Sequence, residues 1–208
     1  MSSRSKSSDR WLREHFSDPF VKRARTEGFR SRAIYKLEEL DRREKLLRPG
    51  HTCLDLGAAP GAWSQYARRQ VGRNGRVVAS DILPMDPIPG VEFVPGDFRE
   101  EAVIGAIRAL FPARGVDVVL SDMAPNMSGI DAVDQPRSMY LAELALETAA
   151  EVLKPGGTAL IKVFQGSGFQ ELIANARRRF GATRTLKPEA SRARSPELYL
   201  LAKGFTIG

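Results

Sequence analysis

The sequence predicts an α/β fold in which a mostly parallel, seven-stranded sheet is covered by helices on both faces. Short apolar runs typical of buried strands alternate along the chain with segments of helical periodicity. Strands joined by helices pair in parallel, and apolar strands of this kind are covered on both faces. The length of 208 residues suits one domain of this type.

The first predicted helix covers residues 31–47, where Ile34, Leu37 and Leu40 share one face and Pro49-Gly50 marks the end. Later helices are expected at 62–71, 100–110, 136–153 and 169–180, and the 136–153 helix is expected to begin with its proline. Strands are expected at 52–56, 76–80, 92–95, 117–121, 158–164, 183–187 and 198–202. In such a sheet, ligands bind beyond the carboxyl ends of the strands.

Positive charge is concentrated at the two ends of the chain. Residues 1–50 hold 14 Lys or Arg against 8 Asp or Glu, residues 51–170 hold 10 against 14, and residues 171–208 hold 8 against 3. Residues 1–28 are interpreted as a basic, flexible N-terminal segment that precedes one folded domain over residues 29–208. Two interpretations of the charge remain open: a solvated surface with a disordered tail, or a surface that binds a polyanion.

The composition excludes several classes of protein. No run of about 18 apolar residues could cross a membrane, and the charged N-terminus lacks the apolar stretch of a secretory signal. The single cysteine, Cys53, lies in an apolar run and is expected to be a buried structural thiol. With His15 and His51 as the only histidines and no Cys/His cluster, no metal site is expected. We predict a cytoplasmic protein, and nothing in the sequence suggests more than a monomer.

A glycine-rich turn follows the first predicted strand, in Cys53-Leu-Asp-Leu-Gly-Ala-Ala-Pro-Gly-Ala-Trp-Ser-Gln65. Gly57 and Gly61 permit unusual backbone angles and let a ligand lie against the main chain. A Walker loop is excluded because no Gly-Lys-Ser/Thr follows, and the Gly-x-Gly-x-x-Gly pattern of dinucleotide sites is absent. The turn alone is also compatible with a strand-to-helix connection that binds nothing.

Acidic residues end four successive predicted strands, and these are Asp55, Asp81, Asp97 and Asp122. Each alone is typical of a turn or a helix cap, but together they line one rim of the sheet and indicate a nucleoside pocket. Asp81 is placed to accept both hydroxyls of a ribose, and Asp97 is expected within reach of an adenine edge. S-adenosylmethionine suits this pocket, because its sulfonium and amine are cationic and it carries no phosphate.

Lys162 interrupts the apolar run Ala159-Leu-Ile-Lys-Val-Phe164 of the fifth predicted strand. A lysine is costly to bury unless it is paired or neutralised. One interpretation is a lysine whose ammonium reaches solvent at the strand end. We favour the other, a lysine held beside carboxylates for chemistry.

Four long motifs are spread across the chain. They are the glycine-rich turn, Ser121-Asp-Met-Ala-Pro-Asn-Met-Ser-Gly129, Lys162-Val-Phe-Gln-Gly166, and Ser191-Arg-Ala-Arg-Ser195 followed by Glu197. Together these motifs resemble those of the FtsJ/RrmJ family of RNA methyltransferases. The resemblance, over roughly residues 29–203, implies a Rossmann-like S-adenosylmethionine-dependent methyltransferase fold and methyl transfer to a ribose 2′-hydroxyl. The family's usual target is a uridine of 23S ribosomal RNA, so ribosomal RNA and the large ribosomal subunit are the implied partners.

The resemblance also implies the site residues. The family's Lys-Asp-Lys-Glu tetrad around the acceptor hydroxyl corresponds by motif context to Lys36, Asp122, Lys162 and Glu197. The family's cofactor positions correspond to Gly61, Trp63, Asp81, Asp97 and Asp122, to which the turn adds Asp55 and Gly57. Ala62 departs from the family, where a second glycine is common, and its methyl group is expected at most to reduce cofactor affinity slightly.

Arginines near both ends of the chain are expected to hold RNA phosphates, and these are Arg23, Arg25, Arg30, Arg32, Arg192 and Arg194. Whether Lys162 accepts the hydroxyl proton or only orients the hydroxyl stays open. Protein and small-molecule methyltransferases lack the tetrad, and the short chain disfavours a transfer-RNA or messenger-RNA-cap enzyme. The complete tetrad argues against an assembly factor that binds RNA without catalysis, and the glycine pattern argues against a nicotinamide dehydrogenase.

Overall fold

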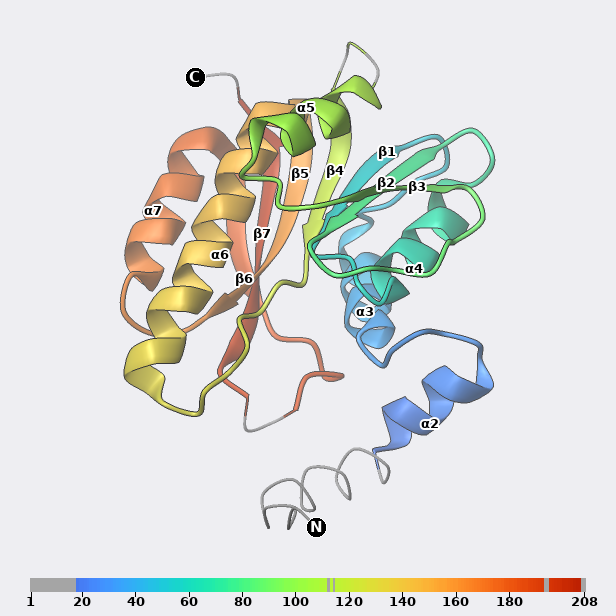
Figure 1. The fold of residues 1–208 in the computed structure, drawn as a ribbon. Helices are drawn as coiled ribbons and strands as arrows, with labels where there is room; N and C mark the ends of the chain where they lie inside the picture. The colour runs from blue at the N-terminus through green and yellow to red at the C-terminus, as the bar shows by residue number, and fades with distance from the viewer. Residues whose placement is uncertain (1–17, 112, 114, 193–194, 207–208) are drawn as a thin grey trace.

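The computed structural model describes residues 18–111, 113, 115–192 and 195–206 and confirms the α/β architecture (Figure 1). In this part of the chain, seven strands form one sheet in the order β3-β2-β1-β4-β5-β7-β6. The strands are β1 (Thr52–Leu56), β2 (Arg76–Asp81), β3 (Val91–Pro95), β4 (Val116–Ser121), β5 (Leu153–Phe164), β6 (Phe180–Leu186) and β7 (Glu197–Phe205). Strands β1 to β5 pair in parallel, whereas β7 runs antiparallel to both β5 and β6. The sheet is therefore mostly parallel, as predicted.

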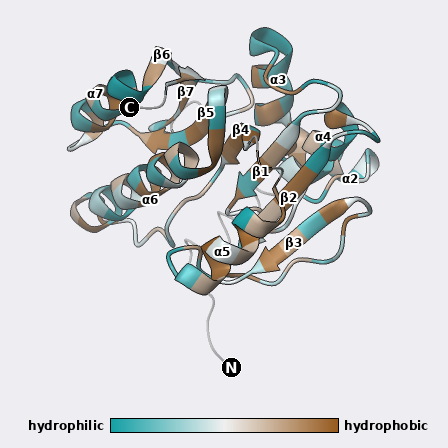
Figure 2. Ribbon diagram, turned by 90° about the horizontal axis from the view of Figure 1, so that it is seen from above, coloured by the Kyte–Doolittle hydropathy of each residue, from teal (hydrophilic) through white to brown (hydrophobic). Residues whose placement is uncertain are grey.

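Helices cover both faces of the sheet. They are α2 (Pro19–Thr26), α3 (Ile34–Glu44), α4 (Ala62–Val71), α5 (Glu101–Ala109), α6 (Asp131–Val152) and α7 (Phe169–Arg179). Side chains of α2, α3 and α4 form one apolar core with the sheet, and side chains of α5, α6 and α7 form a second core on the opposite face. Figure 2 shows the hydrophobic strands between these helices, whose outward sides are hydrophilic.

Two predicted helices differ from the structure by more than one residue at an end. Helix α3 ends at Glu44 because Lys45 adopts a left-handed conformation with φ of 55°, before Pro49 is reached. The prediction that Pro136 begins α6 was wrong, since the helix begins at Asp131 and contains the proline in its second turn. The buried carboxylate of Asp134 stabilises this early start, because it accepts hydrogen bonds from the Ser128 and Gly129 backbone N–H groups that precede the helix.

The N-terminal segment is partly structured. Residues 1–17 lie outside the described residues, but residues 19–26 form α2, whose N-terminus is capped when Asp18 accepts a hydrogen bond from Phe20 N at 2.9 Å. Ala24 of this helix is buried and packs in the same core as α3 and α4. Helix α2, within the predicted flexible segment, therefore packs on the domain.

The described residues bear on the cysteine, on membrane-spanning helices and on groups of metal-binding side chains. Cys53 is fully buried, and burial raises the pKa of its thiol well above the usual value, which agrees with a structural thiol. No helix in the described part of the chain is long and apolar enough to cross a membrane. In the same residues, no group of three or more His, Cys, Asp or Glu side chains could hold a metal ion.

Candidate active site

The sheet topology brings the predicted catalytic residues to one edge. Strand β1 lies between β2 and β4, so the strand order reverses there, and the carboxyl ends of the parallel strands beside such a reversal form a binding crevice. Asp122 directly follows β4, and Lys162 lies near the carboxyl end of β5. Because β7 is antiparallel to β5, its first residue, Glu197, pairs with Phe164 at the same edge.

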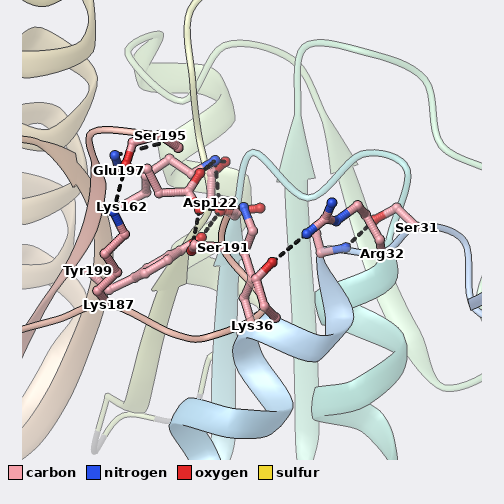
Figure 3. A network of polar contacts seen from close by, with 12 residues as sticks. Ser31, Arg32, Lys36, Asp122, Lys162, Lys187, Ser191, Ser195, Glu197 and Tyr199 are labelled. Atoms are coloured by element: carbon pink, nitrogen blue, oxygen red, sulfur yellow. Dashed lines mark hydrogen bonds and ion pairs between the residues drawn. The ribbon is translucent and has the colours of Figure 1, made fainter. Parts of the chain in front are cut away.

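Four charged side chains meet at this edge in one network (Figure 3). The ammonium of Lys162 lies 2.8 Å from Oδ1 of Asp122 and 3.8 Å from Oε2 of Glu197. It also donates a hydrogen bond to the backbone oxygen of Asp122 at 2.9 Å. Lys36 Nζ lies 2.7 Å from Oε1 of Glu197. The structure thus brings together all four predicted tetrad residues, from α3, β5, β7 and the end of β4.

The network is shielded from solvent. The side chains of Lys162 and Glu197 are 8% and 9% exposed, and those of Lys36 and Asp122 are 13% and 18% exposed. Two cations and two carboxylates balance one another, so each buried charge has an opposite partner. The interpretation of Lys162 as a lysine that reaches solvent was therefore wrong, because its ammonium is held between two carboxylates.

Tyr199 and Ser191 complete the network, and the sequence analysis missed both. The Tyr199 hydroxyl donates to Oδ1 of Asp122 at 2.5 Å, and the Ser191 hydroxyl donates to Oε1 of Glu197 at 2.7 Å. Tyr199 is fully buried and stands opposite Lys162 in the β5–β7 register. Paired residues in antiparallel strands project from the same face of the sheet. Knowing that β7 runs antiparallel to β5 would therefore have placed the Tyr199 side chain beside that of Lys162.

The network sets the protonation of two groups in it. Burial disfavours the charged form of Asp122, but the ammonium groups of Lys162 and Lys36 and the Tyr199 hydroxyl together hold the pKa of this carboxyl below its usual value. Burial and the neighbouring Asp122 raise the pKa of Tyr199 well above its usual value. Asp122 is therefore a carboxylate and Tyr199 a neutral hydroxyl donor at neutral pH.

Trp63 positions the helix that carries Lys36. Its indole N–H donates to the backbone oxygen of Ala33 at 2.8 Å, at the start of α3. The indole ring is buried and lies 5.7 Å from the Tyr199 ring, centroid to centroid. Trp63 thus connects α4, α3 and β7 behind the charged network, with its ring nitrogen already occupied by a protein partner.

The glycine-rich turn forms a close connection between β1 and α4. Gly57 has φ of 71°, and a Cβ atom there would overlap the side chain of Met123, which follows Asp122. Gly61 has φ of 103° and caps α4, and a Cβ atom there would lie 2.7 Å from Sδ of Met85. The two glycines are therefore required for backbone conformation and for space.

Two of the predicted acidic residues shape this turn. Asp81 is buried, and its carboxylate accepts hydrogen bonds from Ala59 N and Leu83 N, both at 2.8 Å. The carboxylate thereby connects the turn after β1 to the end of β2. Asp55 is almost fully buried and accepts a bond from the Ser64 hydroxyl at 2.6 Å. Burial, together with the neighbouring carboxylates of Asp122 and Asp81, raises the pKa of Asp55 to about 7 against the opposing effect of the Ser64 hydrogen bond.

Asp97 lies after β3, and its carboxylate accepts hydrogen bonds from the nearby residue Arg99. Arg99, two residues later, donates to both carboxylate oxygens from its side chain and to Oδ1 from its backbone N–H. These bonds lower the pKa of Asp97 despite partial burial. The Asp97 side chain keeps 23% of its surface exposed, and the Arg99 guanidinium also donates to the Tyr140 hydroxyl at 3.3 Å.

The predicted phosphate-binding arginines differ in their surroundings. Arg23 pairs with Glu27 at 2.7 Å, Arg32 pairs with Asp18 and the backbone oxygen of Ala190, and Arg30 donates to three backbone carbonyls. Arg25 is exposed on α2. Arg192 lines a hollow of about 170 Å³ that opens beside the charged network, together with Ser31, Arg32, Ala33, Lys36, Ser195 and Glu197. Arg194 lies outside the described residues.

Comparison with known proteins gives one consistent result. Residues 29–205 match the family of FtsJ-like methyltransferases. The chain is 61% identical over 204 residues to "Ribosomal RNA large subunit methyltransferase E" of Stenotrophomonas maltophilia, covering 98% of this chain and 97% of that protein. It is 58% identical over 205 residues to the protein of the same name from Legionella pneumophila, covering 99% and 100%. A solved structure from Plasmodium falciparum, titled as a ribosomal RNA methyltransferase, superposes with a TM-score of 0.75 at 30% identity, covering 85% of this chain and 98% of that one.

Proposed function

Because this chain belongs to the FtsJ-like methyltransferase family, we propose that it transfers a methyl group from S-adenosylmethionine to a ribose 2′-hydroxyl of ribosomal RNA. One observation carries the chemical part of this proposal. The ammonium of Lys162 lies between the carboxylates of Asp122 and Glu197, in a network with Lys36 at the binding edge of the sheet. A hydroxyl entering this network meets a positive charge with acceptors on both sides, which is the environment needed to orient an oxygen and remove its proton.

The residues at the edge of the sheet fit S-adenosylmethionine. Gly57 and Gly61 give the turn backbone conformations with positive φ and carry no side chain, so main chain there can approach the cofactor closely. Asp81 would hold the ribose hydroxyls, because its oxygens keep lone pairs beyond the two backbone bonds they accept. Asp97 would hold the adenine edge once Arg99 shares its carboxylate. Asp122 would face the cationic end, and Asp55 and Trp63 would support the pocket from behind.

When bound, the cofactor supplies a methyl group activated by a positively charged sulfur. The protein's part is to align the acceptor oxygen and to handle its proton, and alignment alone can supply about 7–11 kcal/mol of the barrier reduction. Lys36 and Glu197 fix one side of the acceptor position, and Asp122 fixes Lys162 through its carboxylate and its backbone oxygen. An ammonium has three donors and no acceptor, so Lys162 must release a proton before it can accept one, whereas it can orient the hydroxyl directly.

The target proposed is a uridine of 23S ribosomal RNA in the large ribosomal subunit. Both curated relatives carry the name of a large-subunit ribosomal RNA methyltransferase, and they align with nearly the whole of this chain. The uridine comes from the resemblance to the FtsJ/RrmJ family. A ribosomal substrate places the reaction in the cytoplasm, and we propose that the protein acts as a monomer. The net charge of +7, concentrated at the two ends of the chain, supports contact with RNA.

The direct test is to incubate large subunits, and separately free ribosomal RNA, with the protein and methyl-labelled S-adenosylmethionine. A 2′-O-methylated ribose resists alkaline cleavage at its 3′ side, so the labelled position appears as one gap in the hydrolysis ladder. We expect one such gap, at a uridine. Label on a base would contradict the proposed acceptor. RNA binding without any label would instead support an assembly factor that does not catalyse.

A further inference from the structure

Arg30 was predicted to hold an RNA phosphate, but in the structure its guanidinium donates hydrogen bonds to backbone carbonyls of the protein. Nη1 donates to the backbone oxygen of Pro60 at 3.0 Å and to that of Asp86 at 2.6 Å, and Nη2 donates to that of Pro87 at 2.8 Å. The Arg30 backbone N–H donates to Oε1 of Gln65 in α4 at 3.0 Å. Three carbonyls from two separate loops therefore meet on one side chain.

Both loops border the proposed cofactor pocket. Pro60 immediately precedes Gly61 in the glycine-rich turn, and Asp86 and Pro87 belong to the loop that follows Asp81. The two loops are in contact, since a Cβ atom at Gly61 would lie 2.8 Å from Ile88 Cδ1 and 3.0 Å from Arg30 Nη1. Arg30 thus connects the loop that would approach the cofactor with the loop that follows Asp81, the carboxylate at the end of β2 that would hold the ribose.

The same residue begins the segment that leads to Lys36. Residues 30–33 are attached to the body of the protein at both ends, by Arg30 at the first residue and by the Trp63 indole N–H at the oxygen of Ala33. Lys36 follows in the first turn of α3. A shift of the two cofactor loops would therefore be transmitted through Arg30 to the position of the Lys36 ammonium beside Glu197.

We propose that Arg30 is a positioning residue that holds the two cofactor loops together and aligns them with Lys36. The inference rests on the proposed use of S-adenosylmethionine. A planar guanidinium with its fixed fork of donors suits three carbonyls, whereas a lysine ammonium is a point charge on a flexible stem. The role therefore depends on geometry rather than on charge alone, and this separates it from phosphate binding.

Arg25 offers a matched control. It is a second arginine of the same basic region, it is exposed on α2, and its side chain has no hydrogen-bond or ion-pair partner among the described residues. A phosphate contact at Arg25 would contribute to the salt dependence of RNA binding, with a slope of about 0.7 per phosphate on single-stranded RNA. Arg25→Gln should make that slope shallower and leave cofactor affinity unchanged.

The experiment compares the full-length wild type with Arg30→Lys, Arg30→Gln and Arg25→Gln. Isothermal titration measures the affinity for S-adenosylmethionine, and RNA binding at several salt concentrations gives the slope. We expect both Arg30 variants to bind the cofactor about tenfold or more weakly, the effect of losing one hydrogen bond from a charged donor, with an unchanged RNA slope. Backbone amides of Gly61 and Val91, which hydrogen-bond within the two loops, should exchange faster with solvent.

The results distinguish a failure of the positioning role of Arg30 from a failure of the proposed function. If Arg30→Lys binds the cofactor like the wild type while Arg30→Gln lowers the RNA slope, Arg30 is a phosphate contact and the positioning role is wrong. Unchanged exchange at Gly61 and Val91 would also overturn it. If the wild type itself does not bind S-adenosylmethionine, the proposed function fails before Arg30 is tested. Arg30→Lys keeps the charge and most of the volume, so it serves as the folded variant if Arg30→Gln does not fold.

Discussion

Replacing Tyr199 with phenylalanine removes a single hydroxyl from the centre of the proposed site. The hydroxyl donates to Asp122 at 2.5 Å from a fully buried side chain, and the ring, which packs 5.7 Å from Trp63, is retained. Tyr199→Phe therefore leaves no cavity of note. Its effect reports the value of one hydrogen bond to a carboxylate whose side chain is 18% exposed.

The expected loss is about 1.5–3 kcal/mol of unfolding free energy at pH 7, the range for hydrogen bonds to charged groups. The loss should depend on pH. The Tyr199 hydroxyl, with Lys162 and Lys36, holds the pKa of Asp122 below its usual value against burial, so this stabilisation is fully present above the unfolded-state pKa of about 3.9. It is lost as pH falls through the lower folded-state pKa. Below that value the loss should approach the roughly 1 kcal/mol of a neutral hydrogen bond.

Urea unfolding of the wild type and Tyr199→Phe at pH 7, 5 and 3 measures these differences. Tyr66→Phe is the matched control, because the Tyr66 hydroxyl donates to the buried carboxylate of Asp41 at 2.9 Å and lies outside the charged network. Both variants should lose stability at pH 7, but only Tyr199→Phe should lower the rate of methyl transfer. Equal stability of Tyr199→Phe and the wild type at pH 7, or a loss that grows as pH falls, would refute the assignment.

Two further predictions concern the acidic residues of the pocket. Asp97→Ala should weaken S-adenosylmethionine binding about tenfold or more in isothermal titration. The fold should survive, because among the described residues the Asp97 carboxylate accepts hydrogen bonds from Arg99 alone. Unchanged affinity would remove Asp97 from the pocket. The pKa of Asp55 is about 7 in the folded state, mainly because of burial, and about 3.9 in the unfolded state. Between about pH 4 and 7, Asp55 is therefore protonated in the folded state and ionised in the unfolded state. Wild-type stability should therefore fall relative to Asp55→Asn by about 1.4 kcal/mol per pH unit from pH 5 to 7 in urea unfolding, and a flat difference would show that Asp55 ionises normally.

The fold was predictable because its signals are local. Alternating apolar strands and helical segments indicated the sheet and the helices on both faces, and Gly57 and Gly61 marked the first turn. The direction of β7 was not predictable from these signals, since an apolar run such as Leu198-Tyr-Leu-Leu201 pairs equally well in either direction. The start of α6 at Asp131 was missed because the proline at 136 is a stronger local signal than the bonds that Asp134 makes to the preceding loop.

In the candidate site, too, some residues were predictable from local motifs and others depend on the tertiary structure. The family motifs indicated Lys36, Asp122, Lys162 and Glu197, and the structure brings these four side chains together. Tyr199 carries no motif of its own in the sequence and reaches Asp122 only through the register of β7 against β5. The interpretation of Arg30 as a phosphate ligand was drawn from charge alone, and a sequence cannot show which carbonyls surround a guanidinium.

The central claim is that Lys162, held by Asp122 and Glu197, handles the acceptor hydroxyl. Its most direct test is the single-turnover rate of methyl transfer by Lys162→Met with saturating RNA and cofactor, which separates chemistry from binding. We predict a fall of about 10²–10⁴-fold, with cofactor and RNA affinities close to those of the wild type and a circular dichroism spectrum that shows the variant is folded. A rate near that of the wild type would mean that Lys162 and its network play no part in the reaction.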